Sequence, residues 1–334
     1  MSVFFPCHSR AATHPSGGLR RISGNSDELL TNPWTATAPE TIRGAGQEGL
    51  LRRRQAGSPV RTRRHPGAAY ATVLAWRAMP TKDSYLPGTP CWVDLGTTDP
   101  EAARSFYGEL FGWTAEVDER PEAGGYAQFH MKGRPVAGVG GIFTEGMPPA
   151  WTTYIASADV KATAASITEH GGAVMMDAFD VLDAGRMTVF ASPDGAIAGI
   201  WQPIKHQGAG IVNEPFAWCW SDLATRDVEA TRSFYEKVFG WKLKSDPTWG
   251  EFMSLEEREI ASISELGPEM PPQVSAHWRV AFLVDDAEAT IARAQELGGT
   301  PHGPVTDFAS GGRTGALADP QGAQFGVMSF PSQG

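Results

Sequence analysis

The sequence has little of several features that would define a function class at once. Three cysteines, Cys7, Cys91 and Cys219, are too few and too scattered for a disulfide framework or a cysteine metal site. Apolar runs such as 71–76 are far shorter than the roughly 18 residues of a membrane-spanning helix, so a helical membrane protein is excluded. We find no P-loop, EF-hand or G-x-S-x-G pattern, so nucleotide chemistry and nucleophilic hydrolysis have no support. Reduced cysteines of this kind predict a cytoplasmic protein.

Charge is distributed unevenly along the 334 residues. Residues 1–78 contain eleven arginines, no lysine and four acidic residues, a net charge of +7, whereas the rest has 17 basic and 34 acidic residues, or −17. A body this acidic repels phosphate backbones, so we expect no nucleic acid as partner, and any such partner would have to use the N-terminal arm. The short apolar runs predict no membrane partner. The length predicts two domains.

The basic N-terminal arm, residues 1–87, is expected to be disordered. It is rich in Gly, Ser, Thr and Pro and has no sustained helical or strand period. Met79 stands just before the more regular sequence, and we hypothesise that translation begins there. A transit peptide is the alternative, because such segments are also basic and poor in acidic residues.

The rest of the chain repeats itself. The segment 91–113 returns at 219–241, with the shared pattern Cys-Trp-x-Asp-Leu, Asp, Ser-Phe-Tyr and Phe-Gly-Trp. A second segment, 151–195, returns at 278–322. The two shifts agree to within one residue, which indicates a duplicated unit of about 128 residues. We predict domains at 88–205 and 214–330, joined by a linker at 206–213.

Each domain divides into two halves with one plan. After a strand at 92–95, Asp99 and Pro100 predict a helix start, and Gly112 predicts its end. Strands are expected at 113–117, 126–131 and 136–143, which completes a β-α-β-β-β unit. The second half repeats the plan with a strand at 152–156, a helix at 159–170 and a late hairpin into 197–201. The predicted class is α+β, with four such units forming curved sheets around cavities.

The pattern in 92–113, together with the Pro-Asp-Gly turn at 193–195, resembles the vicinal oxygen chelate superfamily of glyoxalases, bleomycin resistance proteins and extradiol dioxygenases. The resemblance covers nearly all of 88–330 and is strongest to tandem glyoxalase-like members. It implies the fold more sharply than the function, because the superfamily includes lyases, dioxygenases, transferases and metal-free drug binders.

The resemblance also implies a divalent-metal site, with His or Gln from the first strand of each half and Glu from the last strand. At these positions the sequence has no complete ligand set, and the six residues found there are Trp92, Thr152, Gly199, Trp220, Arg279 and Gly326. Arg279 is in addition a permanent cation. We therefore predict no cofactor and no metal.

Strand alternation places Trp92 with Asp94, and Trp220 with Asp222, on the face where the family's ligands point inward. We expect Asp94 and Asp222 to be the catalytic candidates, because desolvation raises the pKa of a carboxyl and suits it as a general base. The candidates for binding a flat or apolar small molecule are Trp92, Tyr154, Trp201, Trp220, Arg279, His130 and Met328.

The predicted function is the binding or sequestering of a small molecule by a monomer with an internal pseudo-dimer, or by a homodimer. The alternative is a metal-dependent lyase or dioxygenase with Asp94, His130 or Asp222 as non-standard ligands. In a third hypothesis one domain is a structural copy that only completes the other. Structural roles also stay open: the tryptophans as core residues, and the aspartates as partners of backbone donors or of an arginine.

Overall fold

The computed structural model describes residues 81–142, 146–246, 250–268, 270–307 and 311–331. All of them belong to the unit Thr31–Gly334. The predicted arm up to residue 80, with the hypothetical start at Met79, lies outside the described residues. Residues 81–87, which were also assigned to the arm, pack on the linker: Thr81 forms a bridge with Ile211, and Tyr85 Oη donates to the Ala209 carbonyl at 2.7 Å.

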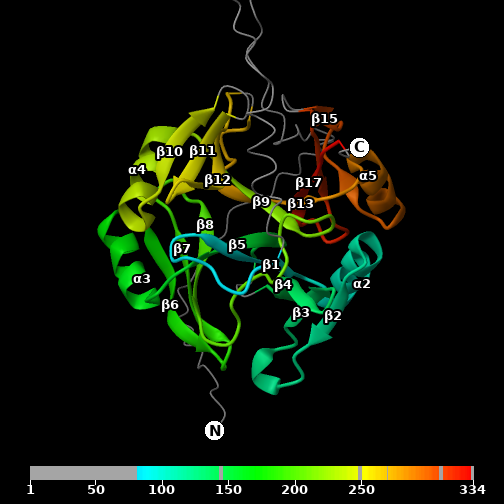
Figure 1. Ribbon diagram of the computed structural model, residues 1–334, viewed down its shortest axis with the longest axis horizontal. Coiled ribbons are helices and arrows are strands. Elements are labelled where there is room, and N and C mark those ends of the chain that lie inside the picture. Colours follow the sequence, from blue (N-terminus) through cyan, green and yellow to red (C-terminus); the bar gives the residue numbers. More distant parts are fainter. Residues whose placement is uncertain (1–80, 143–145, 247–249, 269, 308–310, 332–334) are drawn as a thin grey trace, which may run out of the picture. The chain divides into compact units, whose positions relative to one another are not determined.

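The described residues form two mixed sheets built on the same plan, which confirms the predicted α+β class (Figure 1). The first sheet has the order β2-β3-β4-β1-β5-β8-β7-β6. Its strands are β1 (Pro90–Thr97), β2 (Thr114–Val117), β3 (Ala127–Met131), β4 (Arg134–Gly141), β5 (Ala150–Ala156), β6 (Ala173–Val181), β7 (Gly185–Ala191) and β8 (Ile197–Pro203).

The second sheet has the order β10-β11-β12-β9-β13-β17-β16-β14, and a short strand, β15, pairs with β16 outside this path. Its strands are β9 (Trp218–Thr225), β10 (Lys242–Asp246), β11 (Gly250–Leu255), β12 (Arg258–Glu265), β13 (His277–Leu283), β14 (Thr300–Pro301), β15 (Thr306–Asp307), β16 (Arg313–Ala318) and β17 (Gln324–Ser329).

Each half contributes one α-helix, as the spacing of its apolar residues predicts. In α2 the Asp99 side chain accepts a hydrogen bond from the Ala102 amide at 3.0 Å, and Gly112 ends the helix with a φ of 73°, a left-handed conformation that suits glycine. The helices are α2 (Pro100–Phe111), α3 (Val160–Glu169), α4 (Val228–Phe239) and α5 (Ala287–Glu296), with a 3₁₀ turn η1 (Pro121–Ala123).

The first strands of the two halves meet at the centre of each sheet. In the first sheet β1 and β5 are antiparallel, so that Asp94 lies opposite Thr152 and Trp92 lies opposite Tyr154. On its other side β1 runs parallel to β4, where Asp94 lies opposite Gly138. The candidate residues of both halves are therefore neighbours although they are far apart in the sequence.

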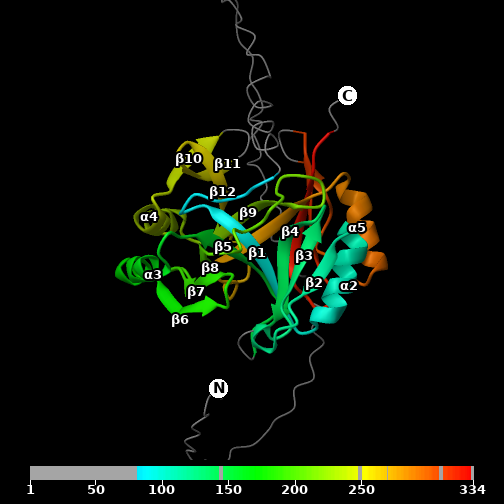
Figure 2. The same ribbon diagram turned by 60° about the horizontal axis from the view of Figure 1, so that its bottom comes forward.

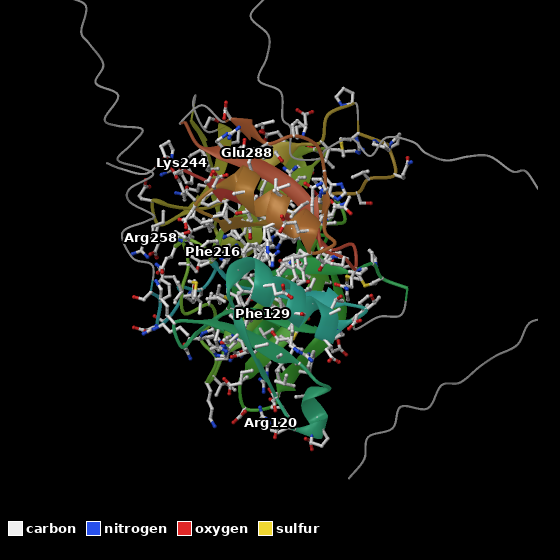
Figure 3. The ribbon with its side chains drawn as sticks, turned by 90° about the vertical axis from the view of Figure 1, so that its right-hand side faces the viewer. Arg120, Phe129, Phe216, Lys244, Arg258 and Glu288 are labelled. Atoms are coloured by element: carbon white, nitrogen blue, oxygen red, sulfur yellow. The ribbon has the colours of Figure 1, made fainter. Side chains whose placement is uncertain are left out.

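The helices of the two sheets pack against each other, α2 beside α5 and α3 beside α4 (Figures 1 and 2). Aromatic rings from both domains form this core, for example Phe111 of α2 and Phe282 of β13, with centroids 5.3 Å apart. Figure 3 shows Phe129 within this packed layer, whereas Arg120 lies at the tip of the connection after β2. No helix among the described residues is long and apolar enough to cross a membrane.

A buried hydrogen-bonded chain ties the two sheets together within this core. The Trp151 indole donates to Tyr107 Oη at 3.0 Å, and Tyr107 Oη donates to Asp319 Oδ2 at 3.1 Å. Trp151 belongs to β5, Tyr107 to α2, and Asp319 follows β16. Removing the phenol hydroxyl would leave a buried donor and a buried acceptor without this partner.

Candidate functional site

A cavity of about 140 Å³ lies beside the pairing of β1 with β5 in the first sheet. Asp94, Tyr126 and Tyr154 supply polar groups to its wall. Most of the remaining wall is apolar and includes Ile142, Met147, Pro148, Met175, Met176, Val189 and Ile197. Met147 and Met175 are 38% and 53% exposed, so their flexible side chains form the part of the wall that meets solvent.

Asp94 is the centre of a hydrogen-bonded cluster on this wall. Its side chain is buried, and its Oδ2 accepts a hydrogen bond from Tyr126 Oη at 3.5 Å. The Tyr154 hydroxyl also donates to this carboxyl. Trp92 Nε1 donates in turn to Tyr126 Oη at 3.2 Å, which fixes the phenol between the indole and the carboxyl. Strand alternation predicted that Trp92 and Asp94 share a face, and their common partner Tyr126 lies on that face.

Two glycines make room for the phenols. A Cβ atom at Gly138 would lie 1.9 Å from Tyr126 Oη, and one at Gly199 would lie 2.2 Å from the ring of Tyr154. A side chain at either position would push the phenol away. Gly199 is one of the positions where the resemblance implies a metal-binding glutamate, and the Tyr154 ring occupies that space instead.

Burial changes the proton affinity of Asp94. It raises the pKa of this carboxyl to about 7, and the hydrogen bonds from Tyr154 and Tyr126 offset only part of the effect. Burial also raises the pKa of both phenols, so they stay protonated and remain donors. Asp94 is thus a carboxyl group that gains or loses a proton near neutral pH inside a mostly apolar cavity, a property suited to a base or to a polar anchor.

The equivalent carboxyl of the second sheet, Asp222, is held in an ion pair. Arg279 Nε donates to its Oδ2 at 2.8 Å, and Ser264 Oγ donates to the same oxygen at 3.0 Å. Burial opposes ionisation of this carboxyl, but Arg279 and the hydroxyls of Ser262 and Ser264 outweigh burial and lower the pKa of Asp222. Trp220 Nε1 donates to Ser262 Oγ at 2.8 Å. Of the two predicted bases, Asp94 is the one placed to exchange a proton near neutral pH.

Three other predicted binding residues of the first domain lie outside the cavity wall. Trp92 and Trp201 are buried, and both rings pack against His206. His130 lies on β3, where its Nε2 is 3.8 Å from the Glu116 carboxylate. The structure therefore brings Asp94 and Tyr154 together at the cavity and leaves these three residues beside it.

In the second domain the predicted residues do not gather around one cavity. Arg279 is committed to Asp222, whereas Met328 packs against a small cluster that includes Cys219. Trp220 lines a separate pocket of about 590 Å³, bounded by residues 81–90, β9 and the start of β12. The duplicated halves thus carry chemically different centres at equivalent positions.

The residues present do not fit the metal site that the resemblance implies. Trp92, Thr152 and Gly199 stand at three of its ligand positions, and none of them completes a ligand set. Within the described part of the chain, no group of three or more His, Cys, Asp or Glu side chains could hold a metal ion. Asp94 and Asp222, two of the alternative non-standard ligands named above, belong to different sheets.

Three residues of the site were missed from the sequence. Tyr126 directly precedes β3 and has no telling spacing to Asp94. Gly138 lies within a glycine-rich stretch, 138–141, and His206 is a lone histidine at the start of the linker. The strand pairing could have indicated Gly138. If β1 pairs in parallel with β4, Gly138 lies opposite the buried Asp94 and has no side chain to fill the space beside the carboxyl.

Comparisons of the sequence identify related proteins. The sequence model described as "Glyoxalase/Bleomycin resistance protein/Dioxygenase superfamily" matches residues 91–198 and 210–327. "Putative glyoxylase CFP32" of Mycobacterium tuberculosis is 41% identical over 255 residues, which are 75% of this chain and 98% of that protein. "Anthracycline biosynthesis protein DnrV" of Streptomyces peucetius is 37% identical over 267 residues, 74% of this chain and 94% of that protein.

Solved structures of similar fold have much lower sequence identity. The Mn(II)-bound glyoxalase from Novosphingobium aromaticivorans has a TM-score of 0.52 at 17% identity, over 73% of this chain and 82% of that one. The 2,2',3-trihydroxybiphenyl 1,2-dioxygenase from Sphingomonas wittichii also has a TM-score of 0.52, at 16% identity, over 73% of this chain and 91% of that one. At these identities the likeness concerns the fold alone.

Proposed function

The chain belongs to the Glyoxalase/Bleomycin resistance protein/Dioxygenase superfamily as a member with two tandem glyoxalase-like domains, and from this premise we propose that its first domain binds a small, flat, largely apolar molecule without a metal ion. The molecule occupies the cavity beside Asp94. Its hydroxyl group donates a hydrogen bond to the Asp94 carboxylate.

One observation carries the proposal: a buried carboxyl group with a raised pKa lines an apolar cavity in which phenols are its partners. A carboxylate in this setting gains most from an additional hydrogen-bond donor, because charge is poorly solvated there. The Tyr126 and Tyr154 hydroxyls fix the carboxyl in place. A ligand hydroxyl that reaches Asp94 therefore finds a positioned acceptor.

The size and chemistry of the cavity favour a planar ring. Its volume of about 140 Å³ matches that of an apolar cavity that takes up a benzene-sized molecule, about 150 Å³. The thioethers of Met147, Met175 and Met176 adapt to ring faces and edges. A larger flat molecule would insert one ring and extend past the exposed Met147 and Met175.

The name of one relative agrees with this ligand class without defining the ligand. One relative is named for anthracycline biosynthesis, and anthracyclines are flat, hydroxylated polycyclic molecules. Another is named as a glyoxylase. The flat hydroxylated molecule is the class that the wall of the first-domain cavity favours.

Isothermal titration calorimetry with 2-naphthol as the probe tests the proposal through the protons released on binding. If the probe hydroxyl donates to ionised Asp94, binding favours the charged carboxyl and lowers its pKa. At about pH 7 the protein then releases about half a proton per bound probe, measured in buffers that differ in ionisation enthalpy. Asp94→Asn should release none, whereas His130→Gln, a change in the same sheet but outside the cavity wall, should behave like the unchanged protein.

Two results would contradict the proposal. One is probe binding by the unchanged protein with no linked proton, or with the same proton release in Asp94→Asn. The other is a stoichiometric divalent metal in tag-free protein that is lost in Asp94→Ala, which would favour the metal-dependent lyase or dioxygenase.

A further inference from the structure

A pocket of about 590 Å³ lies where the two domains and the linker meet, apart from the cavity beside Asp94. Its wall combines segments of both domains with the end of the linker, namely residues from 81–90, 212–213, 218–221 and 258–260. None of these described residues also lines the cavity beside Asp94. Small-molecule sites have volumes of about 300–1,000 Å³ and often lie between domains, so this pocket has the size and place of a separate ligand site.

Hydrogen bonds to the backbone fix the wall of this interdomain pocket. The Lys82 amide donates to the Gly210 carbonyl at 3.1 Å, which ties the start of the first domain to the linker. The Asn213 amide donates to the Trp218 carbonyl at 3.0 Å, and Trp218 Nε1 donates to the Trp220 carbonyl at 3.0 Å. A molecule that binds here therefore meets a largely preformed wall and loses little affinity to ordering it.

Trp220 supplies an aromatic surface to the interdomain pocket. Its equivalent in the first domain, Trp92, is only 3% exposed and packs against the His206 ring with centroids 4.4 Å apart. Trp220 is half-buried and forms part of the pocket wall. Its Nε1 donates to Ser262 Oγ at 2.8 Å, which fixes the orientation of the indole. A flat ring in the pocket can therefore stack on an indole that is already held in place.

Two cationic side chains, Lys82 and Arg258, line the same pocket. In the described part of the chain, neither the Lys82 ammonium nor the Arg258 guanidinium has a hydrogen-bond or ion-pair partner. Arg258 is exposed, and Figure 3 shows it at the edge of the molecule. The first domain shows what an arginine at this position binds: Arg134 begins β4 as Arg258 begins β12, and it donates to the Asp83 carboxylate at 2.9 Å. Arg258 thus lacks the carboxylate that its equivalent has.

The charges around the interdomain pocket suit a ligand with one negative charge. The wall contains two carboxylates, Asp83, which is paired with Arg134, and Glu259. Together with Lys82 and Arg258 these groups are three cations and two anions, which leaves one positive charge. A ligand carboxylate would balance this charge, and a guanidinium binds a carboxylate through two parallel hydrogen bonds.

We propose that the interdomain pocket is a second ligand site of this protein, which binds an aromatic carboxylate with its ring on Trp220 and its carboxylate at Lys82 and Arg258. Neither domain forms the site alone, because Lys82 precedes β1 whereas Trp220 and Arg258 belong to β9 and β12. The site is independent of the function proposed for the first domain. It gives the second domain a ligand of its own, although Asp222 is held by Arg279.

Isothermal titration calorimetry of the full chain with 2-naphthoate tests this second site. The matched probe is 2-naphthamide, which has the same rings and no charge. At about pH 8 both the 2-naphthoate carboxylate and Asp94 are ionised, so this probe is repelled from the first-domain cavity. We expect 2-naphthoate to bind at least about tenfold more tightly than 2-naphthamide, because two cations meet its carboxylate. Added salt should weaken the binding of 2-naphthoate and leave that of 2-naphthamide unchanged.

Variants of the pocket wall separate the contributions of charge and ring. Arg258→Gln and Lys82→Gln should each weaken the binding of 2-naphthoate about tenfold and leave that of 2-naphthamide unchanged. Trp220→Leu should weaken the binding of both probes, because it removes the ring surface. Arg232→Gln, the control, removes an arginine of α4 outside the pocket wall and should change neither affinity. Arg258 is exposed, so its variant decides the question even if Trp220→Leu does not fold.

The inference is overturned if the full chain does not bind 2-naphthoate, if 2-naphthamide binds as tightly, or if Arg258→Gln and Lys82→Gln leave the affinity for 2-naphthoate unchanged. Asp94→Asn should still bind 2-naphthoate. A loss of binding in that variant would place this probe in the first-domain cavity and would also overturn the inference. The proposed function is judged by 2-naphthol and Asp94, so either proposal can fail without the other.

Discussion

Replacing Asp94 with Asn removes the titration of a buried carboxyl while keeping nearly the same shape. Because folding raises the pKa of Asp94 to about 7, the folded protein retains a proton that the unfolded chain loses near pH 4. The stability that this proton contributes is fully present below about pH 4 and is lost as the pH rises through about 7. The Asn variant lacks this loss, so its stability relative to the unchanged protein should increase with pH.

The magnitude follows from the size of the shift. A rise of about three pKa units at about 1.36 kcal/mol per unit corresponds to about 4 kcal/mol between acidic and neutral pH. In the variant, the asparagine amide keeps only part of the hydrogen bonding with Tyr126 and Tyr154. This loss lowers the free energy of unfolding by about 1 kcal/mol at every pH. Asp94→Asn should thus be less stable than the unchanged protein at about pH 4.5 and more stable at about pH 8.

Urea unfolding followed by tryptophan fluorescence at several pH values between about 4.5 and 8 measures this crossover. Asp222→Asn is the matched control at the equivalent strand position. It removes the partner of a buried Arg279, so it should destabilise by about 3–5 kcal/mol across the range, with no gain at high pH. If the free energy of unfolding of Asp94→Asn differed from that of the unchanged protein by a constant amount over the whole pH range, the conclusion that Asp94 is a buried carboxyl with a raised pKa would be refuted.

Two further changes test the packing around the site and between the sheets. In Gly138→Ala the new Cβ would lie 1.9 Å from the Tyr126 hydroxyl oxygen, so the phenol should be displaced. The variant should bind 2-naphthol at least tenfold more weakly, and its free energy of unfolding should fall by about 1–3 kcal/mol. Gly141→Ala, whose new Cβ would have nothing within 4 Å, should leave the unfolding free energy unchanged. An equal loss of stability in both variants in urea unfolding would argue against this geometry. Tyr107→Phe should lower the unfolding free energy by about 1–3 kcal/mol, because Asp319 loses its buried donor. An unchanged urea midpoint would show that this bond contributes little.

Much of the fold could be predicted because its signals are local in the chain. Asp99 and Gly112 mark the two ends of α2 by hydrogen-bonding and backbone preferences that need no tertiary contact. The duplication at 91–113 and 219–241 then carries this plan to the second domain. Residues 81–87 escaped prediction because their partners, such as Ala209, lie more than a hundred positions away.

The candidate site could be predicted only as far as strand alternation reaches. Alternation places Asp94 and Trp92 on one face, but it does not show that Tyr126 would reach them from a connection. It also does not show whether a buried carboxyl lies next to a positively charged side chain. Asp222 lies opposite Arg279 of β13, whereas Asp94 lies opposite Thr152 of β5. This difference, together with the Ser262 and Ser264 hydroxyls that donate to Asp222, decides which carboxyl titrates near neutral pH.

The most direct test of the proposed site is a ¹³C NMR titration of the Asp94 carboxyl, assigned with Asp94→Asn, in the absence and presence of 2-naphthol. The predicted midpoint without the probe is about 7, and it should fall when the probe hydroxyl donates to the carboxylate. A midpoint near the ordinary aspartate value of about 3.9, or a titration that 2-naphthol leaves unchanged, would contradict a ligand site centred on Asp94.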